Sequence, residues 1–88
     1  MQEKRFVLTD PMGLHARPAA QLMMALKDVA SFVTISGNGQ TVDGKDVIAI
    51  LSLGCLAGDE ITFQAEGPDE EAAMELICRV MAQIEQPG

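Results

Sequence analysis

The sequence predicts an α+β fold in which one four-stranded antiparallel sheet is covered on one face by three helices. Two patterns indicate this fold. Residues 60–66 alternate apolar and polar side chains, as a half-buried strand does, and amphipathic helix patterns occupy residues 16–27 and the segment after 67–68. The chain has 88 residues, of which 48% are apolar, so we expect one domain, residues 1–88, with a small two-layer core.

The first third of the chain is predicted to form a strand, a loop and a helix. Residues 4–8 are assigned to the strand, although their alternation is poor, and residues 9–13 to a loop that contains proline and glycine. The helix over 16–27 has apolar residues at three- and four-residue spacing. Pro18 suits its first turn, where a missing N–H costs nothing, and Lys27 suits its last turn, where the helix dipole favours a cation.

A hairpin and a short helix are expected next. Residues 31–36 and 40–43 are rich in β-forming side chains, and an Asn-Gly pair between them is the typical signal of a tight turn. Periodicity alone does not decide the state of the apolar run 47–51. We predict a short helix there, because Asp46 just before the run suits an N-cap and Gly54 just after it suits a helix stop.

The last third carries the whole charge excess of the chain. Residues 59–88 hold eight acidic residues and one basic residue, whereas residues 1–58 hold five of each. Asp69, Glu70 and Glu71 are expected to crowd the first turn of the final helix, where the helix dipole favours carboxylates. We interpret the acidic third as a solvated helix face that keeps the chain soluble.

Composition and charge argue against several functions. A net charge of −7 does not suit a general nucleic-acid binder, which needs a basic face. No run approaches the length of about 18 apolar residues that a membrane-spanning helix needs, and no secretory signal is visible. Cys55 and Cys78 are too few for a disulfide framework, so we expect reduced thiols and a cytoplasmic location. No metal or cofactor is predicted, because no second histidine and no cysteine lies at ligand spacing.

One segment carries recognisable chemistry and the only histidine: Gly13-Leu14-His15-Ala16-Arg17-Pro18. It lies where the loop becomes the first helix, so backbone N–H groups without intrahelical partners can bind an anion there. Arg17 adds a planar guanidinium that suits phosphate oxygens. The positive helix end disfavours imidazolium, which leaves a His15 lone pair free to accept a phosphoryl group. From the residues alone, a surface histidine at a helix start is the more common explanation.

The same segment resembles the active-site signature of HPr, the histidine-containing phosphocarrier family of the bacterial phosphoenolpyruvate-dependent sugar phosphotransferase system. The resemblance covers nearly the whole chain and extends to the turn at 37–39 and to residues 51–54, 58–62 and 65–70. It implies the HPr-like open-faced β-sandwich. It also implies that His15 accepts a phosphoryl group at Nδ1 from phosphorylated enzyme I and passes it to IIA components of sugar permeases.

The resemblance further implies roles for the residues around His15. Arg17 would neutralise the phosphate and contact acidic groups of partners, and the backbone amides of Ala16 and Arg17 would complete the anion site. A transient docking patch of apolar and cationic side chains is expected around them. Its members are Met23, Met24, Lys27, Lys45, Val47, Ile48 and Leu51. Core packing is the competing explanation for the apolar run 47–51, and we expect part of it inward and part outward.

Two positions depart from the family pattern. Asp46 stands where many Gram-positive members carry a serine that a regulatory kinase phosphorylates, so this chain has no hydroxyl to modify there. Its carboxylate either caps the short helix, which we favour, or places a fixed negative charge that partly resembles the phosphorylated serine. Met12 replaces a small polar residue near the site, and a side-chain hydrogen bond is lost with it.

Together these features predict a monomeric phosphocarrier that is not an enzyme in the strict sense. We expect it to contact membrane permeases only peripherally. A regulatory module that docks according to its phosphorylation is an alternative, as is a specialised carrier that serves nitrogen regulation or a dihydroxyacetone kinase. Retention of His15 with Arg17 favours a carrier. A histidine phosphatase ranks low, because the motif lacks a second positioned acid or base.

Overall fold

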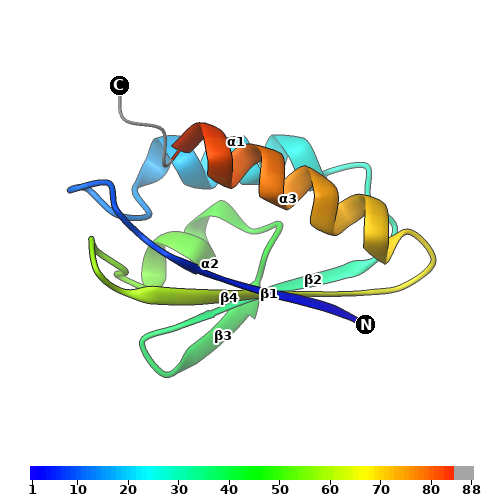
Figure 1. Cartoon of the computed structure of the whole chain (residues 1–88), viewed down its shortest axis with the longest axis horizontal. Coiled ribbons are helices and arrows are strands. Elements are labelled where there is room, and N and C mark those ends of the chain that lie inside the picture. The colour runs from blue at the N-terminus through cyan, green and yellow to red at the C-terminus, as the bar shows by residue number, and fades with distance from the viewer. Residues whose placement is uncertain (85–88) are drawn as a thin grey trace.

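The computed structural model describes residues 1–84, and its elements follow the predicted order (Figure 1). They are β1 (Gln2–Val7), α1 (Ala16–Leu26), β2 (Phe32–Gly37), β3 (Gln40–Asp43), α2 (Val47–Ser52), β4 (Glu60–Glu66) and α3 (Glu70–Ile84). The four strands form one sheet in the order β1-β4-β2-β3, in which every pair is antiparallel. This confirms the predicted α+β architecture, and no helix among residues 1–84 is long and apolar enough to cross a membrane.

β4 lies in the middle of the sheet, and its sequence alternates most strictly. It pairs with β1 from Gln2 opposite Ala65 to Val7 opposite Glu60, and with β2 on its other side. Ile61, Phe63 and Ala65 face the helices and are fully buried, while the residues between them are half-buried. α1 and α3 lie over this buried face, and α2 packs against α1 and β3 (Figure 1).

The core is filled by aliphatic side chains from the sheet and all three helices around one aromatic pair. Phe63 of β4 is fully buried, and its ring meets that of Phe6 edge to face, with 5.7 Å between centroids. Its fully buried aliphatic neighbours in the core are Leu22, Leu26, Ile35, Ile50, Ile61 and Ile77. The composition is consistent with this packing, since only three aromatic residues are present in the chain.

The first strand is displaced from its predicted bounds. β1 begins at Gln2 and ends at Val7, whereas the sequence predicts residues 4–8. Leu8 leaves the ladder because its N–H donates to the Asp59 carbonyl, at 3.0 Å, and its carbonyl accepts from the Gly58 N–H, at 2.7 Å. Leu8 is nevertheless buried, because it packs into the core from the loop.

Two other predicted boundaries are shifted by a contact that sequence patterns do not reveal. The Asp69 carboxylate accepts from the backbone N–H groups of Ala30 and Ser31, at 2.9 and 2.8 Å, and from the Ser31 hydroxyl. β2 therefore begins at Phe32 instead of Ser31. Asp69 lies just before α3 and not in its first turn, because its side chain is committed to this corner between α1 and β2.

The ends of the two shorter helices also differ slightly from the prediction. Lys27 is the C-cap residue of α1, and no basic residue lies in the last turn of that helix. α2 extends to Ser52, one residue beyond the predicted run. The Ser52 hydroxyl donates to the Ala49 carbonyl, at 2.6 Å, and so follows the helix geometry. The short helix itself and its stop near Gly54 are confirmed.

Candidate functional site

His15 is the N-cap residue of α1, and its side chain takes no part in capping. Its backbone is extended, and its carbonyl accepts the first intrahelical hydrogen bond, from the Ala19 N–H at 3.1 Å. The first three helical positions are Ala16, Arg17 and Pro18, and a proline has no N–H. Within the first turn, the amides of Ala16 and Arg17 therefore remain as donors beside the half-exposed imidazole.

Gly13 holds the loop that delivers His15 to this position. Its φ is +63°, and a Cβ on it would lie 2.1 Å from the Cys55 carbonyl oxygen. The next residue, Leu14, is buried and donates its N–H to that same oxygen, at 3.1 Å. The loop is thus pressed against the segment between α2 and β4, which only glycine permits. Sequence patterns marked Gly13 as a breaker, but they did not reveal this contact with Cys55.

Asp10 shapes the other half of the same loop. Its side-chain oxygen accepts from the Met12 N–H, and its carbonyl accepts from the Gly13 N–H, both at 2.8 Å. The Met12 side chain is 64% exposed. The Asx turn therefore fixes the backbone and leaves an apolar side chain at the surface near His15.

The electrostatics of the site depend on one cation without a partner. Arg17 is exposed and makes no hydrogen bond or ion pair with any other residue between 1 and 84. It is also the only charged residue of α1. Its guanidinium is therefore available to an anion, and the helix start adds partial positive charge of its own. Among residues 1–84, all acidic side chains lie outside α1.

Cys55 borders the site but is not suited to be a nucleophile. It is buried, and burial raises the pKa of its thiol, with a further contribution from Asp59. A thiol with a raised pKa stays protonated and is a poor nucleophile. Cys55 and Cys78 are both free cysteines. Among residues 1–84 no cluster of histidine, cysteine or acidic side chains could hold a metal ion.

The predicted docking patch is only partly available at the surface. Met24 and Ile48 are 56% and 76% exposed, and Lys27 is exposed as well. Met23, Val47 and Leu51 are half-buried, and Ile50, which was not among the predicted members, is fully buried. The apolar run of α2 therefore splits between core and surface, as expected. α1 and α2 pack against each other, so the exposed members lie on adjoining helices (Figure 1).

Lys45 has a structural contact that the sequence did not predict. It is half-buried, and its Nζ donates to the Val29 carbonyl at 2.5 Å. This bond ties the segment after β3 to the loop after α1. Lys45 is thus less available to a partner protein than Lys27, because the same ammonium group that would contact the partner already binds the Val29 carbonyl.

Asp46 caps α2, which confirms the interpretation we favoured. Its Oδ1 accepts from the Ala49 N–H, at 3.2 Å, and its backbone is extended as an N-cap requires. Whether its charge also resembles a phosphorylated serine stays a prediction.

Sequence reasoning missed one exposed apolar residue next to the site, Leu56, which is 59% exposed. It follows Cys55 directly, in the segment against which Gly13 packs. The only feature of the sequence that could have predicted its exposure is the position of an apolar residue in the loop between α2 and β4.

Known proteins resemble this chain over nearly its whole length. Residues 2–83 match the family model described as the HPr component phosphorylation site of the phosphotransferase system. The chain belongs to the HPr family. Phosphocarrier protein HPr of Buchnera aphidicola subsp. Acyrthosiphon pisum is 39% identical to it over 85 residues, which covers 97% of this chain and 100% of the relative.

Solved structures of the family have the same fold. The histidine-containing phosphocarrier protein of Mycoplasma superposes with a TM-score of 0.92 at 31% identity, covering 99% of this chain and 100% of that one. A dimer of HPr from Thermoanaerobacter tengcongensis gives a TM-score of 0.75 at 29% identity, with 99% and 100% coverage. The predicted HPr-like open-faced sandwich is therefore confirmed, and the family supports a carrier protein of the phosphotransferase system over a catalytic enzyme.

Proposed function

We propose that this chain carries a phosphoryl group on His15, which it accepts from phosphorylated enzyme I and passes to IIA components of sugar permeases. The observation that carries the proposal is the position of His15 at the start of α1, beside two backbone amides that can act as donors. Arg17 lies next to it and has no partner among residues 1–84. Membership in the HPr family, whose relatives are named phosphocarriers, supports the same role.

The proposed transfer needs position and electrostatics more than acid–base chemistry. A neutral His15 attacks phosphorus through Nδ1, and a P–N bond forms there while the bond to the donor nitrogen breaks. Charge builds on the three equatorial oxygens as the bond to the donor lengthens. The amides of Ala16 and Arg17 and the Arg17 guanidinium can donate hydrogen bonds to those oxygens. Transfer to a IIA component is the same step in reverse, with a different partner nitrogen.

The docking surface for both partners would surround His15. Met12, Met24, Ile48 and Leu56 are exposed apolar side chains on the elements and loops next to it. Together with Arg17, such a patch suits brief, repeated contact with acidic partner surfaces. We propose that the chain acts as a monomer in this relay, and the elution volume in size-exclusion chromatography checks that.

Intact-mass analysis after incubation with phosphoenolpyruvate, Mg²⁺ and enzyme I tests the proposal. The wild type is expected to gain one acid-labile phosphate, and His15→Ala is expected to gain none. Arg79→Ala, on the exposed face of α3, serves as a matched control that should gain the phosphate normally. Absence of phosphate on the wild type with an active cognate enzyme I would sink the sugar-relay proposal.

A further inference from the structure

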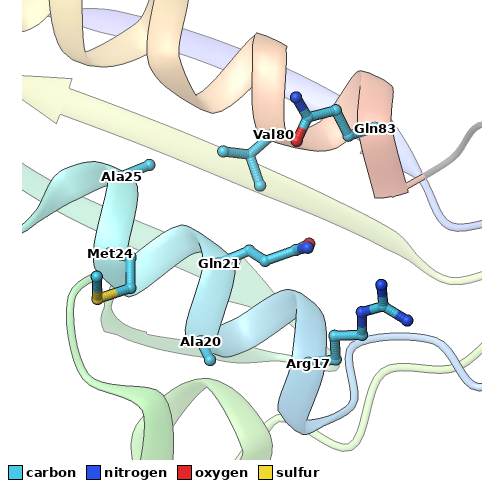
Figure 2. A pocket seen from close by; sticks show the side chains of 7 residues that line it. All are labelled: Arg17, Ala20, Gln21, Met24, Ala25, Val80 and Gln83. Carbon is cyan, nitrogen blue, oxygen red and sulfur yellow. The ribbon is translucent and has the colours of Figure 1, made fainter.

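An open groove separates α1 from α3 beside the His15 loop (Figure 2). Its volume is about 450 Å³, within the range of roughly 300–1,000 Å³ that is typical of small-molecule sites. Apolar atoms make up most of its surface. The residues that line it are Arg17, Ala20, Gln21, Met24, Ala25, Val80 and Gln83.

Charge is distributed unequally along this groove. Arg17 and Gln83 lie toward one end, and apolar side chains lie toward the other (Figure 2). Among residues 1–84, no carboxylate lines it. The second half of α3, from residue 76 to residue 84, has Arg79 as its only charged residue. The acidic residues of α3 all lie earlier in the helix: Glu70, Glu71 and Glu75. Within the described residues, the lining of the groove therefore offers an anion one cation, Arg17, and no carboxylate.

Arg17 supplies the polar end of the groove. Its side chain extends toward α3, and within residues 1–84 its guanidinium has no partner (Figure 2). A planar guanidinium binds a carboxylate through two parallel hydrogen bonds. Gln21 and Gln83 line the groove as well, and their side-chain amides can donate hydrogen bonds to a polar ligand there.

The apolar part of the groove sets the length of the ligand. Ala25 lies eight residues after Arg17 on α1, which corresponds to about 12 Å along the helix axis. An extended chain of eight carbons spans about 9 Å, so it covers most of this distance from the guanidinium past Val80 toward Ala25. The small side chains of Ala20 and Ala25 leave room for it.

We propose that the groove between α1 and α3 binds a small amphiphilic carboxylate, with its head on Arg17 and its apolar tail against Ala25 and Val80. One consequence rests on the proposed function. Arg17 is also the proposed ligand of the phosphoryl group on His15, so the two anions compete for one guanidinium. Because such coupling is reciprocal, a bound carboxylate slows phosphorylation, and phosphorylation weakens carboxylate binding.

Titration of the unmodified ¹⁵N-labelled chain with sodium octanoate tests the site directly. The amides of Ala25, Val80 and Gln83 are expected to shift in a saturable way, with a dissociation constant of about 1 mM or tighter. Octanamide has the tail without the charge, and acetate has the charge without the tail. Each is expected to bind at least about tenfold more weakly than octanoate. Equal binding of octanamide, or shifts confined to the surface of α2, would overturn the proposal.

A matched pair of variants on α3 locates the head group. Gln83→Glu places a carboxylate on the α3 wall of the groove, across from Arg17, and is expected to weaken octanoate binding about tenfold. Ala82→Glu adds the same charge at an exposed neighbouring position that does not line the groove, and it is expected to bind octanoate as the wild type does. Similar losses in both variants would mean a general charge effect and would overturn the assignment of Arg17.

The remaining outcomes separate this site from the proposed phosphocarrier function. Octanoate is expected to slow phosphoryl transfer from enzyme I to His15, while octanamide at the same concentration does not. A chain that enzyme I never phosphorylates counts against the proposed function alone, because the titration of the unmodified chain decides the groove. A dimer in size-exclusion chromatography that dissociates on addition of octanoate would assign the groove to a second copy of the chain and overturn the proposal.

Discussion

The two ends of the molecule use their charged groups in opposite ways. Where α3 begins, the Asp69 carboxylate holds the corner between α1 and β2, and Glu70 binds the terminal ammonium of Met1 at 2.7 Å. At the other end, next to the His15 loop, Arg17 has no partner within residues 1–84. The His15 side chain makes no capping hydrogen bond with α1. Figure 1 shows these two regions at opposite ends of the sheet.

The difference lies in what fixes each region. At the Asp69 end, side chains bind backbone groups and thereby hold loops in place. At the His15 end, the Asp10 carboxylate turns the loop before Gly13, and Gly13 and Leu14 then hold the loop through backbone contacts with the Cys55 carbonyl. Backbone contacts leave the functional side chains free for ligands. Variants that remove one kind of contact at a time therefore test whether the two ends differ in this way.

The largest effect is expected from Gly13→Ala, because the new Cβ cannot avoid the Cys55 carbonyl oxygen. The loop has to move, so we expect a loss of about 3 kcal/mol or more in the free energy of unfolding, together with slow phosphorylation of His15. Gly39→Ala is the matched control. Gly39 also has a positive φ, but a Cβ added there would meet no atom within 4 Å, so about 1–2 kcal/mol is expected. Urea unfolding of both variants measures the contrast.

Arg17→Ala should separate function from stability. We expect the rate of phosphoryl transfer to fall about 100-fold, because one donor to the charged oxygens is removed. The free energy of unfolding should change by no more than about 0.5 kcal/mol, because the exposed guanidinium holds nothing in the described part of the chain. Rapid-quench phosphorylation and thermal unfolding measure the two effects. A clear loss of stability would show that Arg17 supports the fold and would remove the contrast between the two ends.

Ser31→Ala tests the Asp69 end, where we expect a loss of stability without a loss of function. Ser31 is 1% exposed and bonds Asp69 through its hydroxyl, so we expect a loss of about 2 kcal/mol without a change in the rate of phosphorylation. Ser36→Ala is the control, because the Ser36 hydroxyl bonds the Thr41 hydroxyl on the exposed sheet face. It should cost about 0.5 kcal/mol. Slow phosphorylation of Ser31→Ala would mean that the two ends are coupled.

Acid should remove the stabilising contacts at the Asp69 end. The Ser31 hydroxyl and the Ala30 amide lower the pKa of Asp69, and the Met1 ammonium lowers the pKa of Glu70. A carboxyl group with a lowered folded-state pKa stabilises the fold above its unfolded pKa, near 4, and loses that contribution as the pH falls through the folded value. Asp69→Asn should therefore show a smaller drop in stability between pH 5 and about pH 2 than the wild type. Denaturant unfolding at each pH checks this, and identical drops would exclude Asp69 as the source.

The smallest effect is expected from Asp46→Ser. Serine caps a helix about as well as aspartate, so stability should stay within about 0.5 kcal/mol. If the cap is the whole role of Asp46, the kinetics of phosphorylation by enzyme I stay unchanged. A faster rate in the variant would instead support the fixed negative charge as a partial substitute for a phosphorylated serine.

Local patterns predicted the elements well because neighbouring residues determine them. The alternation of residues 60–66 identified β4, Asp46 identified the start of α2, and the loop-to-helix boundary placed His15 at the start of α1. The contacts that fix the site and the far corner were not predictable in this way. Asp69 and Ser31 are 38 residues apart in the chain, and Gly13 meets Cys55 across the fold. Only the assembled sheet brings such pairs together, and no periodicity records them.

The proline in the third position of α1 has a consequence for how firmly a phosphoryl group on His15 would be held. Pro18 removes one of the N–H groups that a helix start usually offers, and two amides remain near His15. A third amide would tighten the grip on the bound group and make its departure slower. Under the proposed function, the chain has to release the phosphoryl group as readily as it accepts it. The absence of one donor at Pro18 would then favour release to the next protein.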